Sequence, residues 1–83
     1  MYNEEYYLEK TSSCCPEQYN VYKNNEMVGY LRLRNGVFVV KYPDVEGGLI
    51  YIAITSGDGC FDKRERTYYL NRAIEKIDER LKR

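Results

Sequence analysis

GYLRLRNGVFVVKY, residues 29–42, carries the clearest structural signal in this chain of 83 residues. Asn35-Gly36 is a strong hairpin signal, because a type I′ turn needs a positive φ angle at both of its central residues. On either side of this dipeptide, apolar and polar side chains alternate with the period of two that is typical of a half-buried strand. The stretch therefore predicts a β-hairpin whose two-residue turn is Asn35-Gly36.

A two-residue turn also determines which residues of the hairpin lie opposite one another. It pairs Arg34 with Val37 and, residue by residue, continues to Tyr30 opposite Lys41. Directly opposed residues share a face of the sheet. The predicted core face carries Leu31, Leu33, Phe38 and Val40, and the other face carries Tyr30, Arg32, Arg34, Val37, Val39 and Lys41.

Two further strands are predicted to flank this hairpin. QYNVYK (18–23) precedes it, with Asn24-Asn25 as the turn, although the uncertain loop length leaves the register of this strand open. LIYIAIT (49–55) follows the hairpin after the turn-forming run PDVEGG. In this last strand Ile50, Ile52 and Ile54 are predicted to face the core, and Tyr51 and Ala53 to face outward. The strands together predict a four-stranded antiparallel meander.

The C-terminal residues predict one helix. Asp62, followed by Glu65 three residues later, forms a capping-box pattern with aspartate as the N-cap. Apolar residues then recur at helical spacing on one stripe, at Leu70, Ala73, Ile74, Ile77 and Leu81. The predicted fold class is therefore α+β: a four-stranded antiparallel β-meander followed by one C-terminal α-helix packed on one sheet face.

The N-terminal segment, residues 1–16, leaves two alternatives open. A cap at Asn3 would begin a short helix, whereas residues 6–8 could equally add an edge strand, with a loop after either one. The remaining residues, 17–83, are predicted to form a single α+β domain, which is a size that buries only a small core.

Composition argues against enzymatic chemistry. The chain has no histidine, so neither a Ser-His-Asp nor a Cys-His arrangement can be built. A carboxylate pair such as Glu65 with Asp58 is explained by helix capping and turn chemistry. No catalytic residue is assigned, and the protein is not expected to be an enzyme.

Cysteine spacing and hydropathy bear on metals, redox state and location. Cys14 and Cys15 are adjacent and Cys60 is distant, unlike the paired spacing of structural zinc ligands, so no metal site or cofactor is predicted. Adjacent cysteines bridge each other only with strain, and all three thiols are expected to be free.

The sequence predicts neither a signal peptide nor a membrane span. No apolar run follows a basic start, and the longest apolar run, residues 49–54, is far below the ~18 residues of a membrane span. A cytoplasmic protein without a membrane partner is expected.

Five short strings carry a resemblance to known sequences: CCPEQYNVY (14–22), VGYLRLRNG (28–36), YPDV (42–45), GDGCF (57–61) and ERTYYL (65–70). With them the chain resembles small uncharacterised proteins of Firmicute genomes, phages and mobile elements. The resemblance implies an accessory gene in a phage or mobile-element context, and compact proteins of that kind often bind and inhibit a host or competitor protein. It assigns no functional residue.

The sheet face opposite the helix is the predicted contact surface. Its predicted partner-binding residues are Tyr30, Arg32, Arg34, Val39, Lys41 and Tyr51. Tyrosine, arginine and aliphatic residues together are typical of protein interfaces, so the predicted partner is an unidentified protein, and the apolar members also predict a homodimer. Two alternatives remain open: a plain solvated face, and a nucleic-acid-binding face with stacking tyrosines. Equal numbers of acidic and basic residues, 13 each, disfavour the nucleic acid.

Overall fold

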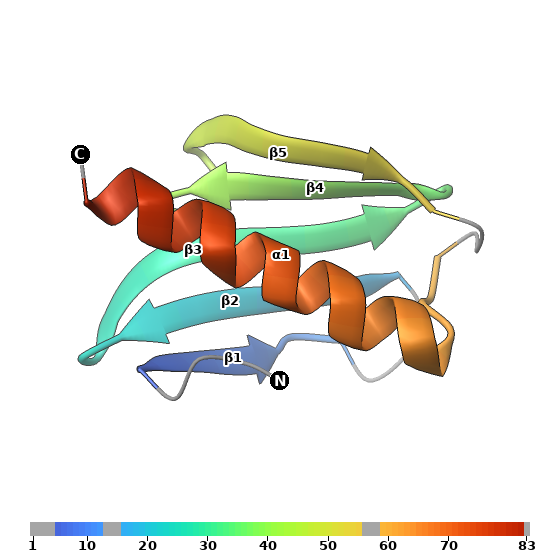
Figure 1. The fold of residues 1–83 in the computed structure, drawn as a ribbon, viewed down its shortest axis with the longest axis horizontal. Helices are drawn as coiled ribbons and strands as arrows, with labels where there is room; N and C mark the ends of the chain where they lie inside the picture. Colours follow the sequence, from blue (N-terminus) through green and yellow to red (C-terminus); the bar gives the residue numbers. More distant parts are fainter. Residues whose placement is uncertain (1–4, 13–15, 56–58, 83) are drawn as a thin grey trace.

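The computed structural model describes residues 5–12, 16–55 and 59–82 of the chain. In chain order the elements are β1 (Tyr6–Lys10), β2 (Glu17–Lys23), β3 (Glu26–Arg34), β4 (Val37–Tyr42), β5 (Gly48–Ile54) and α1 (Lys63–Leu81). The strands form one antiparallel sheet in the order β1-β2-β3-β4-β5, and α1 covers one face of it (Figure 1).

The predicted α+β meander is thus confirmed, with one strand more than predicted. The additional strand is β1, so the edge-strand alternative for the N-terminal segment is the one that the structure contains. Asn3, the cap of the alternative helix, lies outside the described residues. Among the described residues, no helix combines the length and the apolar character needed to cross a membrane.

Both central turns follow from asparagine and glycine. The β3–β4 register runs from Arg34 opposite Val37 to Tyr30 opposite Lys41, which confirms the predicted hairpin. Asn35 and Gly36 have φ angles of 53° and 78°, and the β2–β3 turn likewise has two consecutive asparagines with positive φ. Asparagine and glycine adopt this left-handed region more readily than other residues, and consecutive positive φ angles match the twist of the flanking strands.

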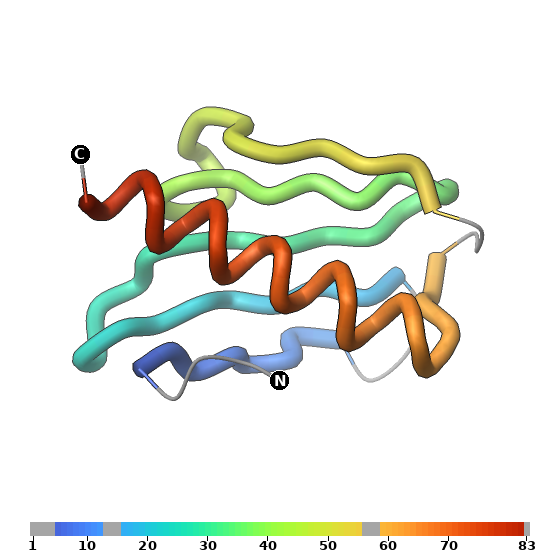
Figure 2. Tube along the Cα trace, viewed as in Figure 1, coloured from blue at the N-terminus to red at the C-terminus, as the bar shows by residue number. Residues whose placement is uncertain are grey.

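The core lies between the sheet and α1, which runs obliquely across the strands (Figure 2). Its fully buried side chains include Val21, Leu31, Leu33, Phe38, Val40, Leu70 and Ile77. Gly29 lies where the helix crosses β3: a Cβ atom there would overlap Cδ1 of Ile77. The missing side chain therefore lets the helix approach the sheet closely at this point.

The predicted helix start and apolar stripe are confirmed. Asp62 is the N-cap; its side chain accepts a hydrogen bond from the backbone N–H of Glu65 at 2.9 Å, and its own N–H donates to the Glu65 side chain at 3.3 Å. Leu70, Ala73, Ile74 and Ile77 are buried, and Leu81 is partly buried against the same core.

The predicted orientation of β5 is wrong for most of its length. Ala53 lies opposite Phe38 on the helix face, whereas Ile52 and Ile54 lie on the opposite face and are 55% and 74% exposed. The cause is a β-bulge between Val40 and Lys41, which shifts the register of the β4–β5 ladder. A shift of one residue moves every following side chain to the other face. Only Ile50, partly buried against the core, lies as predicted.

Candidate interaction surface

The sheet face opposite α1, here called the open face, is covered by no other helix or strand of the described chain. Residues in register across the strands form rows on it. One row consists of Gln18, Arg32, Val39 and Ile52, and a second of Arg34, Val37 and Ile54. These rows place basic side chains on the central strand directly beside aliphatic side chains on β4 and β5.

Five of the six predicted contact residues lie on the open face, and four of them are accessible there. Arg34 is exposed, and Arg32, Val39 and Lys41 are half-buried around it on β3 and β4. The Nε atom of Arg32 is buried without a hydrogen-bond partner, while Nζ of Lys41 donates to the carbonyl oxygen of Val45 at 3.4 Å. The structure therefore assembles the basic part of the predicted surface.

The two predicted tyrosines do not belong to the accessible surface. Tyr30 shares the open face but is only 8% exposed, and its hydroxyl donates to Oε1 of Gln18 at 3.3 Å. Tyr51 lies on the helix face, in edge contact with the Phe38 ring at 6.4 Å. The guanidinium of Arg72 lies 5.7 Å from the centre of the Tyr51 ring. Both tyrosines are thus packed within the fold. Tyr30 is buried on the open face beside Gln18, and the β4–β5 bulge places Tyr51 on the helix face.

The β5 part of the apolar surface was missed by sequence reasoning, which placed only Val37, Val39 and Ala53 on this face as apolar residues. Ile52 and Ile54 take the place that the prediction gave to Tyr51, and Val37 and Val39 lie beside them in register. We call these four residues the aliphatic patch. Adjacent exposed aliphatic side chains next to arginines are more informative than single ones, because contiguous apolar surface is typical of interaction sites.

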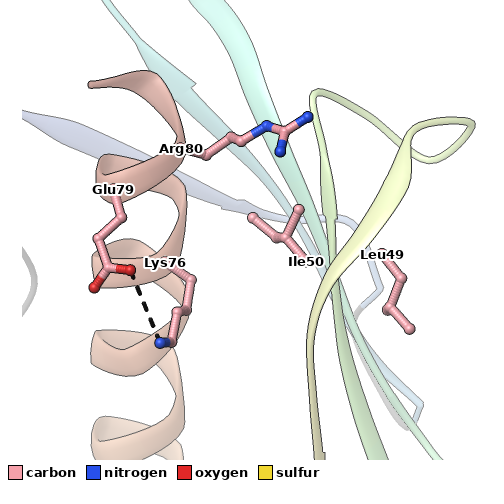
Figure 3. Close-up of a pocket in the computed structure, with 5 residues that line it drawn as sticks. All are labelled: Leu49, Ile50, Lys76, Glu79 and Arg80. Atoms are coloured by element: carbon pink, nitrogen blue, oxygen red, sulfur yellow. Dashed lines mark ion pairs between the residues drawn. The ribbon is translucent and has the colours of Figure 1, made fainter. Parts of the chain in front are cut away.

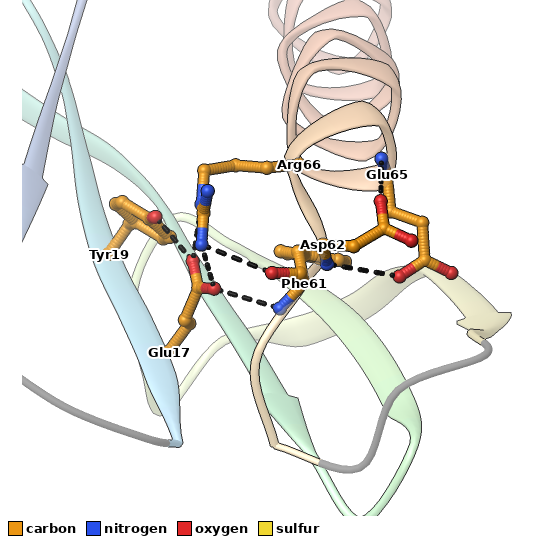
Figure 4. Close-up of polar contacts among 6 residues, drawn as sticks. All are labelled: Glu17, Tyr19, Phe61, Asp62, Glu65 and Arg66. Atoms are coloured by element: carbon orange, nitrogen blue, oxygen red, sulfur yellow. Dashed lines mark hydrogen bonds and ion pairs between the residues drawn. The ribbon is translucent and has the colours of Figure 1, made fainter.

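A buried carboxylate, the most unusual polar group of the fold, lies under the start of α1 (Figure 4). Glu17 is 1% exposed. Its two oxygens accept hydrogen bonds from Nε and Nη2 of Arg66 at 3.1 and 2.7 Å, from the Tyr19 hydroxyl at 2.7 Å and from the backbone N–H of Phe61 at 2.8 Å. Such a group would be a functional-site candidate if it were free to react.

Instead, the surroundings of Glu17 indicate a structural role. Burial alone would raise the pKa of Glu17, but the hydrogen bonds from Arg66, Tyr19 and Phe61 outweigh it and hold that pKa below its ordinary value. Burial and the bond to Glu17 raise the pKa of the Tyr19 hydroxyl, so it remains a donor. The carboxylate is therefore charged and fully engaged, and it joins β2 to the helix rather than offering a base.

A shallow pocket lies between the last turns of α1 and the start of β5 (Figure 3). It is lined by Leu49, Ile50, Lys76, Glu79 and Arg80. Nζ of Lys76 lies 3.9 Å from Oε1 of Glu79, and the Arg80 guanidinium lies 5.7 Å from the Tyr42 ring centre. Because its charged groups contact one another or the protein, this pocket offers no converging set of free polar atoms.

Cys60 is disulfide-bonded, so the expectation that all three thiols are free is wrong. Cys14 and Cys15 lie outside the described residues, as does Asp58, which was considered with Glu65 as a carboxylate pair. In the described part of the chain, no group of three or more cysteine, aspartate or glutamate side chains could hold a metal ion.

Comparisons with known proteins identify no relative. No family model matches the chain, and no curated protein and no solved structure matches it. The functional interpretation therefore depends on the surface itself.

Proposed function

We propose that this protein is a non-enzymatic protein-interaction module whose contact surface is the aliphatic patch together with Arg32, Arg34 and Lys41. The observation that carries the proposal is the exposure of Ile52 and Ile54, at 55% and 74%, in register with the two arginine-bearing positions of β3. An aliphatic centre with arginine at its side matches the composition of protein interfaces.

Nucleic-acid binding remains the second candidate, supported by the three basic side chains of the open face. Stacking of bases requires exposed rings beside the cations, and here Tyr30 is buried and Tyr51 is on the helix face. The exposed ring on this face is Tyr7 on β1, which packs against Tyr22, and the Tyr22 hydroxyl donates to the carboxylate of Glu9. A negative charge beside the rings opposes phosphate, so a protein partner is favoured.

The proposal includes a biological setting. The resemblance to small proteins of phages and mobile elements supports an accessory role, such as the inhibition of a host or competitor protein. Disulfides such as that of Cys60 persist mainly in oxidising compartments. Thiol labelling of the protein taken directly from its cells therefore tests the location: Cys60 should be reduced in the cytoplasm and oxidised elsewhere.

Partner capture from the native host with charge-reversed variants tests the function. Arg34→Glu changes an exposed position of the open face, and the matched control Arg64→Glu makes the same change at an exposed position of α1. Arginine is a common hot-spot residue. We expect Arg34→Glu to weaken capture by roughly thirty-fold or more, for an effect of ~2 kcal/mol, and Arg64→Glu to bind as the unaltered chain does.

Two outcomes would contradict this proposal. If Arg34→Glu retains every partner at unchanged affinity while its melting temperature is unaltered, the open face is not the contact surface. If the captured species is nucleic acid, and its affinity falls linearly with the logarithm of salt concentration, the second candidate replaces the first.

A further inference from the structure

The outer edge of β5 has backbone groups that pair with no strand of the described chain, although one of them, the Ile54 carbonyl oxygen, accepts a hydrogen bond from the Tyr69 hydroxyl at 3.5 Å. In the described chain β5 pairs with β4 only. The N–H of Thr55 donates to the carbonyl oxygen of Gly36 at 2.8 Å, so these two residues form a hydrogen-bonded pair. Hydrogen-bonded and non-hydrogen-bonded pairs alternate along an antiparallel ladder. The N–H and C=O groups of Ile52 and Ile54 therefore point away from β4, toward the free edge.

Apolar side chains flank this edge on both faces of the sheet. Six large hydrophobic side chains of the described residues are exposed, and three of them, Leu49, Ile52 and Ile54, belong to β5. A fourth, Tyr68 on α1, packs edge-on against Tyr69 at 4.9 Å, and the Tyr69 hydroxyl lies 3.5 Å from the carbonyl oxygen of Ile54. The exposed apolar surface of the molecule is thus concentrated around one strand.

This strand also lacks the features that protect sheet edges. Natural edge strands avoid pairing with other chains through lysine, proline, inward charges or bulges. β5, GLIYIAI, contains no charged residue and no proline, and its bulge near Ile50 leaves the stretch from Tyr51 to Thr55 regular. The other edge strand, β1, carries Glu9 and Lys10. Of the two edge strands, β5 is therefore the one better suited to pair with a further strand.

We propose that β5 pairs antiparallel with β5 of a second copy of this chain, so that two five-stranded sheets become one continuous sheet. The two-fold axis passes beside Ala53, which places Ile52 opposite Ile54 of the partner subunit. Both residues direct their backbone groups to the free edge, so this register forms hydrogen-bonded pairs. On the open face the four isoleucines of the two subunits form one cluster, and the two aliphatic patches become continuous.

The absence of charge on β5 favours a second copy of this chain as the occupant. Across a two-fold axis each residue of a strand faces residues of the same short segment, so any charge would face its like. Gly48–Ile54 carries none. The whole chain has 13 basic and 13 acidic residues, so two copies have no net charge to repel one another. A symmetric interface of this kind closes after two subunits. This inference goes beyond the proposed function, because it concerns an edge that the partner surface does not require.

Sedimentation equilibrium of the whole chain, from low-micromolar to near-millimolar concentration, tests the dimer. Ile54→Lys places a charge on the β5 edge, and Tyr7→Lys makes a matched change on the β1 edge, where the side chain is 65% exposed. The unaltered chain and Tyr7→Lys should dimerise, and Ile54→Lys should stay monomeric with an unchanged circular dichroism spectrum. A monomeric unaltered chain throughout this range overturns the proposal, as does an Ile54→Lys variant that dimerises like the unaltered chain.

A cross-link tests the register. Residues opposite each other in a non-hydrogen-bonded pair have Cα atoms ~4.5 Å apart, a distance that a disulfide can span. Ala53→Cys should therefore give a covalent dimer on mild oxidation, whereas Tyr7→Cys and the unaltered chain should not. Cross-linking through Tyr7→Cys instead of Ala53→Cys would assign the dimer to the other edge and overturn the proposal. Arg34→Glu leaves the β5 edge unaltered, so loss of partner capture and loss of the dimer are distinguishable.

Discussion

The two lateral ends of the sheet, the β1–β2 side and the β5 side, contact α1 in different ways. On the β1–β2 side the attachment is polar and short: the Tyr6 hydroxyl donates to Asp78 at 2.7 Å, and Nη2 of Arg66 contacts Glu17 at 2.7 Å. On the β5 side the cation–ring distance from Arg72 to Tyr51 is 5.7 Å, and the Tyr69 hydroxyl is 3.5 Å from the Ile54 carbonyl oxygen. Hydrogen bonds to charged groups depend steeply on distance and direction, whereas ring contacts tolerate displacement.

The directional contacts that stabilise the fold and the surface that we propose for binding therefore lie at different sides of the sheet. The directional contacts define where the helix lies on the sheet, and they are concentrated at the side whose edge strand carries charge. The side whose contacts with the helix are less directional has the uncharged edge and the exposed isoleucines. Another chain can therefore bind at the β5 side without breaking the buried hydrogen bonds of the β1–β2 side.

The largest expected effect follows from removal of the arginine on the β1–β2 side. Arg66→Met leaves the buried Glu17 carboxylate without its cation, a change that typically costs ~3–5 kcal/mol of unfolding free energy. Because the Arg66 side chain is itself 35% exposed, we expect the lower end of this range. The matched variant Arg72→Met on the β5 side should lower the unfolding free energy much less, because its contact with the Tyr51 ring is exposed to solvent. Urea unfolding of both variants measures the difference, and equal losses would remove the contrast between the two sides.

A smaller effect is expected from acid, because protonation weakens the same pairing without deleting it. The pKa of Glu17 is held below its ordinary value in the folded chain. The corresponding stability is fully present above the unfolded pKa of ~4.3 and is lost as the pH falls through the lower folded pKa. Unfolding free energy measured against pH should therefore decline in this acidic window. Glu17→Gln should flatten this decline; an equally steep decline in that variant would assign it to other carboxylates, such as Asp78.

The smallest effect concerns a single hydroxyl of the β1 edge. Tyr6→Phe keeps the buried ring but removes the hydrogen bond to Asp78, and a bond to a charged group contributes ~1.5 kcal/mol or more. We expect a loss near this value, because Asp78 retains its contact with Lys82 at 2.8 Å. Tyr7→Phe, at the neighbouring exposed position, should leave the thermal midpoint unchanged. A Tyr6→Phe variant as stable as the parent would show that β1 is held by packing alone.

The elements with local signals could be predicted from the sequence. The β3–β4 register follows from the φ preferences of Asn35-Gly36, and the helix start follows from the side chains of Asp62 and Glu65, within four residues of each other. β1 remained undecided, because its short sequence YYLEK has no turn chemistry at its beginning and no clear alternation.

The candidate surface was only half predictable, because its apolar part depends on a bulge. LIYIAI contains no polar residue to mark the solvent face, so its periodicity could not distinguish the two orientations. The positions of Arg32, Arg34, Val37, Val39 and Lys41 on the open face followed from the hairpin register. The buried position of Glu17 could not be predicted, because its partner Arg66 is 49 residues away and each looks like an ordinary surface residue in the sequence. The Cys60 disulfide was missed as well, because the spacing of three cysteines in the sequence does not show which of them lie close together in the fold.

The meander order has a consequence for how the chain acquires its structure. Every strand pairs with its neighbour in sequence, so the sheet can grow hairpin by hairpin at low contact order, and such topologies fold fast. The helix comes last in the chain, and its long-range bond between Arg66 and Glu17 closes only when the sheet exists. During synthesis on the ribosome, the helix face of the nascent sheet remains uncovered until the 19 residues of α1 emerge. Formation of the hairpin at Asn35-Gly36 would then precede docking of the helix, which covers one face of the sheet and leaves the open face accessible.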